Sequence, residues 1–346
     1  MNDDEQIDTE TPVTVLGAGS WGTALAIHMA RRGFPTHLWT RRSDHSQEMR
    51  THRRNTRYLS DFDLPSEIEP TDDLAQALAE ARLVICAIPS HGMRDAMQHV
   101  RKVLPSGAPP LWLVAAKGIE VETLENMHEV LSDELPESHA EQIAVLGGPS
   151  FAAEVAQGLP TTVVVGARRD DVGVQIQRML SGDGVRAYVT DDVLGVELGG
   201  TFKNVIALAA GMCDGAGLGQ NARAGLITRG LAEMSRLAVA LGANPATMAG
   251  LAGMGDLVLT CTGGLSRNRR VGIALGQGRR LDEVLQEMGM VAEGVKNTLS
   301  AYKLAQREGV EMPIVETMHA ILYLDLPVDA AVDALMGRKL KAEREW

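Results

Sequence analysis

Apolar residues are distributed differently in the two halves of the chain. Up to about residue 190, short apolar runs alternate with amphipathic stretches, a pattern typical of a parallel sheet covered by helices. Two amphipathic stretches, residues 91–104 and 124–135, carry apolar residues at helical spacing and are predicted helices. The predicted strands are residues 13–16, 36–40, 83–88, 111–116, 143–146, 161–165 and 186–189.

Beyond about residue 191 the apolar positions keep a helical period, and no segment has a convincing strand pattern. The predicted helices are residues 193–210, 222–241, 293–308 and 313–322, and the glycine-dense segment 211–219 is predicted to separate the first two. The charged tail, residues 338–346, is expected to be solvated. The 346-residue chain therefore predicts an α/β domain over residues 1–190 and an all-helical domain over residues 191–346.

The first predicted strand is followed directly by a glycine-rich turn and an alanine-rich apolar helix. The turn reads Gly17-Ala18-Gly19-Ser20-Trp21-Gly22 and matches the dinucleotide-binding pattern of a Rossmann-type doubly wound domain. Gly17 permits the turn, Gly19 lets the backbone approach a pyrophosphate, and Gly22 lets the helix pack closely on the strand. The helix N-terminus offers N–H groups to the phosphates. We therefore expect a dinucleotide site rather than a structural turn.

Two arginines, Arg41 and Arg42, follow the second predicted strand, where NAD-selective sites usually place an acidic residue. Their guanidinium groups match a ribose 2′-phosphate, which they could hold through charge-assisted bidentate bonds. The alternative is a solvated basic turn before the helix around Asp44. The pair favours NADP(H) as cofactor, and NAD(H) stays open.

Composition narrows the function further. Hydrophobic residues make up 45% and charged residues 23% of the chain, which is ordinary for a globular enzyme. The net charge of −12 and the 3% of aromatic residues argue against a nucleic-acid partner. The three cysteines lack metal-ligand spacing, so we expect no metal site. Segment 1–10 has no apolar core of a signal peptide, and no apolar stretch is long enough to predict a membrane span. We therefore expect a cytoplasmic protein.

Two strand ends carry residues that could contact a substrate. Lys117 follows strand 111–116, where open α/β sheets bind ligands, although a surface lysine in a loop is the alternative. Gly148 and Ser150 follow strand 143–146 and precede a predicted helix, so backbone N–H groups there could bind an anion. Ser150 is also suited to cap that helix, which is the more common role.

The helical half carries two further candidates. Lys203 lies beside Asn204 in an apolar helix, where desolvation would lower its pKa and make it usable as a proton donor and acceptor; snorkelling to the surface is the alternative. Arg267 lies between Ser266 and Asn268 and resembles part of a phosphate cradle, although these three could equally form an N-cap and a solvated basic turn. We favour anion binding because cations at a helix start oppose its dipole.

Six segments together resemble the bacterial NAD(P)-dependent glycerol-3-phosphate dehydrogenases. They are residues 17–26, 115–118, 147–152, 199–207, 222–230 and 255–262, in the family's order and at similar spacing. The resemblance covers nearly the whole chain. It implies reversible oxidation of sn-glycerol 3-phosphate to dihydroxyacetone phosphate, run towards glycerol 3-phosphate for phospholipid synthesis. It also implies a helical domain of the 6-phosphogluconate dehydrogenase type and a homodimer.

The resemblance implies roles for individual residues as well. Lys203 is the implied catalytic acid and base, Asp256 orients it or a substrate hydroxyl, and Lys117 adds positive charge. The implied substrate contacts are Lys117, Gly148, Ser150, Lys203, Asn204, Asp256, Thr260, Ser266, Arg267 and Asn268. The implied cofactor contacts are Gly17, Gly19, Ser20, Trp21, Gly22, Arg41, Arg42, Tyr58, Lys117, Ala152, Arg267, Val291 and Glu293.

Two other functions fit parts of the sequence. A related two-domain reductase could act on another small 2-hydroxy or 2-keto acid, but a substrate without phosphate would leave Arg267 without a function. A nucleotide sensor without catalytic activity could use the same scaffold, and the presence of Lys203, Lys117 and Asp256 argues against it. A requirement for a phosphorylated triose as substrate distinguishes the first function from both.

Overall fold

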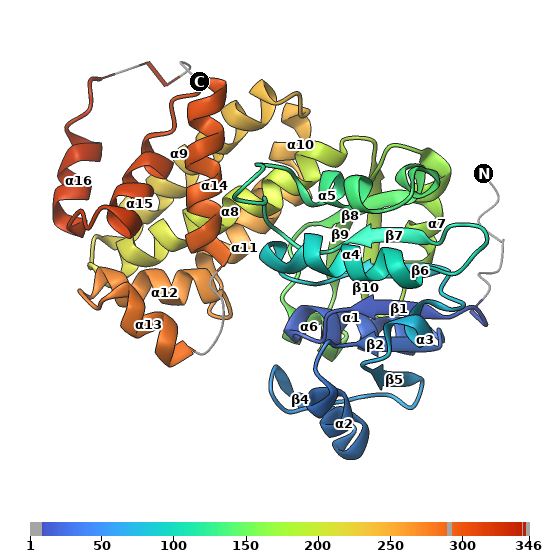
Figure 1. Ribbon diagram of the computed structural model, residues 1–346. Helices are drawn as coiled ribbons and strands as arrows, with labels where there is room; N and C mark the ends of the chain where they lie inside the picture. The colour runs from blue at the N-terminus through green and yellow to red at the C-terminus, as the bar shows by residue number, and fades with distance from the viewer. Residues whose placement is uncertain (1–8, 289–292, 341, 344–346) are drawn as a thin grey trace. The chain divides into compact units, whose positions relative to one another are not determined.

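An eight-stranded sheet, in the order β10-β9-β8-β7-β6-β1-β2-β5, forms the centre of the first part of the chain in a computed structural model (Figure 1). The structure describes residues 9–288, 293–340 and 342–343. The strands are β1 (Val13–Leu16), β2 (Thr36–Trp39), β5 (Ile68–Thr71), β6 (Leu83–Cys86), β7 (Leu111–Val114), β8 (Ile143–Gly147), β9 (Thr161–Ala167) and β10 (Val185–Thr190). Neighbours are parallel except β8 and β9, so β9 and β10 run against the other six strands.

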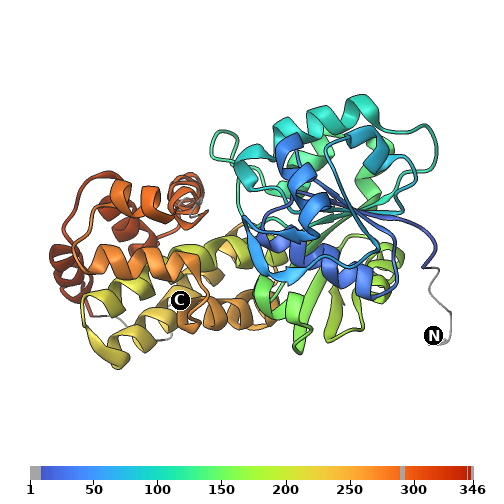
Figure 2. The same cartoon turned by 90° about the horizontal axis from the view of Figure 1, so that it is seen from below.

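Helices cover both faces of this sheet, as a doubly wound fold requires. Figure 1 shows α1 and α6 on one face and α4 and α5 on the other, and Figure 2 shows the same arrangement from below. The helices are α1 (Ser20–Arg31), α2 (Ser43–His52), α3 (Leu74–Leu78), α4 (Met93–Val103), α5 (Met127–Glu134), α6 (Ala152–Gln157) and α7 (Asp170–Leu180), with the 3-10 turns η1 (Ser90–Gly92) and η2 (Glu137–Gln142). The central strands β1, β6 and β7 are buried along their whole length, which explains why β6 and β7 are continuous apolar runs.

All seven predicted strands of this part are present, and so are the helices predicted over residues 91–104 and 124–135, although α5 begins at Met127 rather than at 124. The sequence does not predict β5, nor the small antiparallel hairpin formed by β3 (Arg54–Asn55) and β4 (Leu59–Asp63). The hairpin lacks a simple alternation of apolar and polar residues, and its register shifts between Arg54 and Asn55. A strand of this kind leaves no clear periodic signal.

The second part of the chain is helical. The helices are α8 (Val193–Gly215), α9 (Gly219–Ala240), α10 (Pro245–Ala249), α11 (Asp256–Thr262), α12 (Arg267–Gly276), α13 (Leu281–Met288), α14 (Glu293–Glu308), α15 (Pro313–Tyr323) and α16 (Val328–Met336), with the π-helical turn η3 (Leu251–Gly255) before α11. No described residue beyond 190 lies in a strand, in agreement with the predicted all-helical domain. In the tail, residues 338–340 and 342–343 are exposed.

The glycine-dense segment 211–219 is mostly helical, which corrects the predicted break. Helix α8 continues to Gly215, and only residues 216–218 separate it from α9. A Cβ on Gly211 would lie 2.1 Å from the Arg269 carbonyl oxygen, and one on Gly215 would lie 2.2 Å from that of Ile273. These glycines therefore allow α8 and α12 to cross with their backbones in close contact.

Helix α8 is also long and apolar enough to cross a membrane, so the prediction that no stretch reaches that length and hydropathy is wrong. Within its most apolar window, however, 94% of the residues are buried inside the protein. Its buried side chains, among them Phe202, Val205 and Ile206, belong to the apolar core of the helical part. In this structure α8 is the central helix of that core.

The chain divides into two units whose boundaries do not follow the sequence order. One comprises the chain up to Ala116 together with Met127–Val193, and the other comprises Lys117–Asn126 together with Leu194–Trp346. The chain therefore passes between the units three times. Lys117 and the loop that follows it belong to the helical unit, although Lys117 lies only three residues after the end of strand β7. The functional division into residues 1–190 and 191–346 remains a prediction.

Candidate active site

The turn between β1 and α1 gives each of its three glycines a separate reason to lack a side chain. Gly17 has a φ of +110°, and a Cβ there would lie 2.8 Å from the Ala87 carbonyl oxygen. A Cβ on Gly22 would lie 1.9 Å from the carbonyl oxygen of Gly17. Gly19, the N-cap of α1, faces open space, with no atom within 4 Å of an added Cβ.

The open space over Gly19 fits a dinucleotide. The backbone N–H groups of the first turn of α1 have no partners within that helix, and they lie at the positive end of its dipole. No acidic side chain lies in that turn to neutralise it. A pyrophosphate could therefore approach the backbone here, as the sequence predicts.

Tyr58, expected at the cofactor site, lies beside the glycine turn. Ser20 Oγ donates a hydrogen bond to the Tyr58 carbonyl oxygen at 2.7 Å, and the Tyr58 ring meets His45 edge to face at 5.5 Å between centroids. Trp21 Nε1 donates to the Ala115 carbonyl oxygen at 3.1 Å. The expected cofactor residues Ser20, Trp21 and Tyr58 are thus all held by the unit's own contacts.

A buried asparagine that the sequence analysis did not select fixes the loop carrying Tyr58 to the glycine turn. Asn55 is fully buried, and its Nδ2 donates to the Ala18 carbonyl oxygen at 2.9 Å and to Thr23 Oγ1 at 2.7 Å. Its Oδ1 accepts from the Tyr58 N–H at 3.3 Å and lies 3.0 Å from His45 Nε2. All four hydrogen-bonding positions of the amide are used, because a buried amide with unmet positions would be costly. The only sequence signal is an asparagine in a polar run without periodicity.

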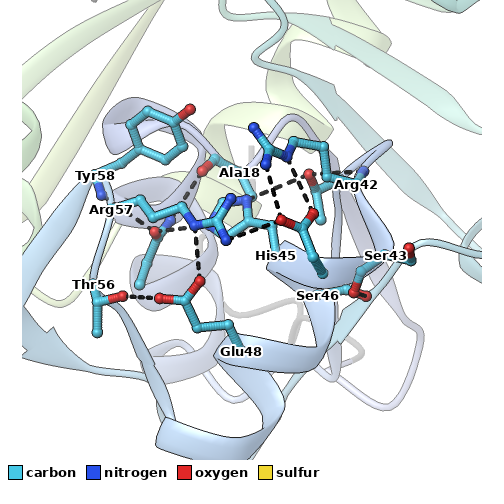
Figure 3. A network of polar contacts seen from close by, with 12 residues as sticks. Ala18, Arg42, Ser43, His45, Ser46, Glu48, Thr56, Arg57 and Tyr58 are labelled. Atoms are coloured by element: carbon cyan, nitrogen blue, oxygen red, sulfur yellow. Dashed lines mark hydrogen bonds and ion pairs between the residues drawn. The ribbon is translucent and has the colours of Figure 1, made fainter. Parts of the chain in front are cut away.

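The two arginines after β2 differ in their surroundings. Both are exposed, and Arg42 donates from Nε and Nη2 to the two carboxylate oxygens of Asp44, at 3.1 and 2.9 Å (Figure 3). Arg57, which sequence reasoning did not select, also donates to Asp44, at 3.1 Å, and to Glu48, at 2.8 Å. Hydrogen bonds from Arg42 and then Arg57 hold the pKa of Asp44 well below its ordinary value. Arg42 is therefore part of a larger charged cluster with Asp44, Arg57 and Glu48.

The turn after β8 holds Gly148, Ser150 and Ala152. Gly148 has a φ of +103°, and a Cβ there would lie 3.1 Å from Val163 Cα. Ser150 does not cap helix α6, which corrects that interpretation: the N-cap is Phe151, and Ser150 Oγ donates to the Gly148 carbonyl oxygen at 3.0 Å. Ala152 begins α6 and packs on the apolar core of the unit.

In the helical unit, one carboxylate holds two lysines. Asp256 Oδ2 accepts from Lys117 Nζ at 2.7 Å, and Asp256 Oδ1 accepts from Lys203 Nζ. Lys203 Nζ also donates to Thr260 Oγ1 at 2.9 Å, and Thr260 Oγ1 donates to the Asp256 carbonyl oxygen at 2.6 Å. The exposed fractions of the side chains are 1% for Asp256, 8% for Lys203 and 15% for Lys117. Four of the expected substrate contacts are thus joined in one hydrogen-bond network through Asp256.

Glycines in α8 make this cluster possible. A Cβ on Gly199 would lie 2.4 Å from a backbone carbonyl oxygen of η3, so only glycine lets the two segments touch there. Lys203 follows one helical turn later and reaches Asp256, which begins α11 directly after η3. A Cβ on Gly200 would lie 3.3 Å from Lys117 Cγ, so Gly200 leaves room for the stem of that lysine. Turns with π-helical bonding are frequent at functional sites.

Burial and charge act in opposite directions on this cluster. Burial lowers the pKa of Lys203 to about 8, against the attraction of Asp256. Burial alone would raise the pKa of Asp256, but the positive charges of Lys117 and Lys203 outweigh it and hold that pKa below its ordinary value. Lys203 is therefore able to gain and lose a proton near neutral pH, whereas Asp256 stays ionised.

The predicted phosphate cradle is partly engaged in structural contacts. Ser266 caps α12 by accepting from the Arg269 N–H at 3.2 Å. Asn268 Nδ2 donates to Asn204 Oδ1 at 2.9 Å, and Asn268 Oδ1 accepts from the Gly294 N–H at 3.0 Å. Both asparagines are buried, whereas the Arg267 side chain is exposed. The asparagine pair thus links α8, α12 and α14.

Glu293 and Val291, the remaining expected cofactor contacts, come near the start of α14. Glu293 begins that helix, and burial raises the pKa of its carboxyl group against the charges of Arg267, Lys117 and Lys203. Val291 lies outside the described residues. Among the described residues, no group of three or more His, Cys, Asp or Glu side chains could hold a metal ion.

A doubly wound sheet with this glycine turn, together with a helical unit holding a buried lysine on a carboxylate, is typical of two-domain nicotinamide-dependent dehydrogenases. Family models described as NAD-dependent glycerol-3-phosphate dehydrogenase N-terminus and C-terminus match residues 12–172 and 192–333. The chain belongs to the NAD-dependent glycerol-3-phosphate dehydrogenase family.

Individual relatives agree with this assignment. A glycerol-3-phosphate dehydrogenase [NAD(P)+] from Citrifermentans bemidjiense is 51% identical over 331 residues, covering 96% of this chain and 98% of that protein. The crystal structure of glycerol-3-phosphate dehydrogenase from Coxiella burnetii is 40% identical, with a TM-score of 0.90 over 95% of this chain and 100% of that one. A D-mandelate dehydrogenase structure with NADH has 14% identity and a TM-score of 0.60 over 94% of this chain and 99% of its own, and shares the fold alone.

The open space over Gly19 gives a test of the glycine turn. A Gly19→Val variant should fold normally, because Gly19 has an extended backbone conformation and nothing lies within 4 Å of its Cβ. Its new side chain should weaken binding of NADPH and NADH alike, by about tenfold or more, because it occupies the path of the pyrophosphate. Fluorescence titration of each cofactor and thermal unfolding would measure the two effects.

Gly22→Ala is the matched control, since its Cβ would lie 1.9 Å from the Gly17 carbonyl oxygen. That variant should lose thermal stability. Normal cofactor affinity in Gly19→Val would contradict the placement of the pyrophosphate.

Proposed function

We propose that the chain catalyses the reversible NAD(P)-dependent reduction of dihydroxyacetone phosphate to sn-glycerol 3-phosphate. The observation that carries this proposal is the buried cluster of Lys203, Asp256 and Lys117 in a chain of this family. One carboxylate shared by two ammonium groups leaves an excess of positive charge. Such an excess suits a reaction in which a carbonyl oxygen becomes negative.

The nicotinamide, when bound, supplies the hydride for C2 of the substrate carbonyl. Lys203 donates the proton that the carbonyl oxygen then requires, and takes it back in the oxidation. Asp256 and Thr260 hold the Lys203 ammonium group in place, and Lys117 adds a second positive charge. Because these side chains are largely buried, their charges interact more strongly than they would in water.

The remaining residues bind and orient. Arg267 and the buried residues Ser266 and Asn268 are proposed to hold the substrate phosphate, so that binding energy from this end positions the carbonyl. The other proposed substrate contacts are Gly148, Ser150, Asn204, Lys117 and Thr260. The proposed cofactor contacts are Gly17, Gly19, Ser20, Trp21, Gly22, Arg41, Arg42, Tyr58, Lys117, Ala152, Arg267, Val291 and Glu293.

The cofactor preference follows from the two arginines, the cytoplasmic location from the sequence, and the oligomeric state and direction of the reaction from the family resemblance. NADP(H) is the preferred cofactor, because Arg41 and Arg42 follow β2 where an acidic residue would select NAD(H). The enzyme acts in the cytoplasm as a homodimer. It works mainly towards glycerol 3-phosphate, for phospholipid synthesis.

Oxidation of NADPH and NADH with dihydroxyacetone phosphate, followed by absorbance, tests the function. We expect rapid oxidation with the phosphorylated triose and little with dihydroxyacetone or a 2-keto acid, because Arg267 would have no phosphate to bind. Turnover of the 2-keto acid instead would favour the related reductase. Normal cofactor binding without any turnover would favour a nucleotide sensor.

The pKa of Lys203 predicts opposite pH profiles for the two directions. Reduction needs the protonated lysine, so its kcat/KM should be level below pH 8 and fall as the pH rises through about 8, whereas oxidation should rise over the same range. Asp256→Asn removes the charge that favours the ammonium form, so the same limb should move to lower pH. Steady-state rates from about pH 6 to pH 10 at saturating cofactor would measure this. A limb that does not move would contradict the assignment of Lys203.

The phosphate role of Arg267 can be separated from general charge effects. Arg267→Ala should raise the KM for dihydroxyacetone phosphate by about tenfold or more, because a charge-assisted hydrogen bond to phosphate is lost. Arg270→Ala, another exposed arginine in the first turn of α12, is the matched control and should leave KM unchanged. An equal KM in the two variants would argue against the cradle.

A further inference from the structure

The charged cluster after β2 contains an acidic residue at the place where a 2′-phosphate would compete with it. We propose that Asp44 is a cofactor-specificity residue: it occupies the guanidinium groups of Arg42 and Arg57, so that NADPH must displace it and NADH need not. Asp44 thereby brings the affinities for the two cofactors closer together. This inference rests on the proposed binding of NADP(H) at Arg41 and Arg42.

The position of Asp44 follows from the sheet. Strands β1 and β2 pair in parallel with Leu16 opposite Trp39, so the glycine turn and the arginines leave the sheet at the same level. The adenosine ribose of a dinucleotide lies at the end of the second strand of such a fold. Asp44 lies in the first turn of α2, only five residues beyond Trp39, the last residue of β2. A 2′-substituent would therefore meet this cluster first.

Arg57 is held in this cluster by a rigid loop. The loop is fixed by the buried Asn55 amide and by the hydrogen bond from Ser20 to the Tyr58 carbonyl oxygen. From there Arg57 donates to Glu48 at 2.8 Å and to Asp44 at 3.1 Å. Figure 3 shows the contact between Arg57 and Glu48. Its side chain is 31% exposed, against 56% for Arg42. Arg57 is thus a third guanidinium group at the expected 2′-phosphate position.

The hydrogen-bond geometry makes the competition direct. Arg42 uses Nε and Nη2 for the two oxygens of Asp44, which is the same bidentate edge that a phosphate would take. A 2′-phosphate must therefore break this pair or bind to the remaining N–H donors of Arg42. A ribose 2′-hydroxyl carries no charge and leaves the pair intact. The acid thus lowers the gain from the 2′-phosphate without affecting NADH.

The charge count leads to the same conclusion. In the network of ion pairs, two arginines, Arg42 and Arg57, face two acids, Asp44 and Glu48, so the charges balance. Removing the charge of Asp44 while keeping its shape would leave an excess of one positive charge. The attraction for a 2′-phosphate should rise accordingly, with no comparable change for a neutral ribose.

Binding of both cofactors to the full-length protein tests the proposal without reference to activity. Asp44→Asn should lower the dissociation constant of NADPH by about fivefold, the scale of an exposed ion pair, and change that of NADH by less than about twofold. Arg57→Gln should weaken NADPH alone. Asp63→Asn is the matched control, because it breaks an exposed pair with Arg54 in the same hairpin and should change neither affinity. Fluorescence titration gives the constants, and 2′,5′-ADP and 5′-AMP serve as shorter probes by calorimetry.

The outcomes separate this inference from the proposed function. If Arg42→Ala weakens NADPH but Asp44→Asn leaves it unchanged, the arginines bind the phosphate and the role of Asp44 is overturned. If Arg42→Ala leaves NADPH unchanged, the 2′-phosphate site itself is wrong. If Asp44→Asn weakens both cofactors and lowers the melting temperature, Asp44 supports the structure and does not set specificity.

Discussion

The proposed chemistry of this protein depends on the sharing of Asp256 between Lys203 and Lys117. A single buried carboxylate would be costly, and so would either buried ammonium group. Together they satisfy one another, but one negative charge cannot neutralise two positive ones. Burial, aided by the charge of Lys117, keeps the pKa of Lys203 close to neutral pH, and the excess of positive charge leaves an attractive environment for a new negative charge. Stability of the cluster and reactivity of the lysine are thus two results of the same arrangement.

The close approach of backbones in the helical unit is the condition for this cluster. Gly199 allows α8 to touch η3, and Gly200 allows Lys117 to lie over α8. Gly211 and Gly215 further along the same helix allow the crossing with α12, which carries Arg267. Catalytic and binding candidates from distant parts of the sequence are therefore arranged along one helix. Larger residues at these positions would separate them.

The sequence predicted most of the fold because buried parallel strands and amphipathic helices leave strong periodic signals. The seven strands are present for this reason, and the close backbone contacts at Gly17 and Gly22 agree with the glycine pattern. The hairpin carrying Tyr58 has no such signal, and its position depends on the buried amide of Asn55. The prediction of a helix break at residues 211–219 was wrong because glycine occurs both in turns and where helices pack closely, and local sequence does not distinguish the two uses.

The candidate site was predictable where a motif marks it and unpredictable where contacts decide. Lys203 and Lys117 follow from their sequence surroundings and Asp256 and Thr260 from the resemblance, and the structure brings the four together. The contact of Arg57 with Asp44 could not be read from the sequence, because Arg57 comes from a different loop. Ser150 was assigned a cap that Phe151 occupies, since helix ends shift by a residue without changing the pattern.

The passage of the chain between the units has a consequence for how such proteins can be divided or exchanged. Because Lys117 belongs to the helical unit but follows strand β7, neither unit is a continuous stretch of the gene. A fragment beginning after residue 190 would lack one of the two cations of Asp256. Recombination between relatives at a single point could not exchange the helical unit whole. The two units are therefore expected to be inherited together rather than shuffled as separate modules.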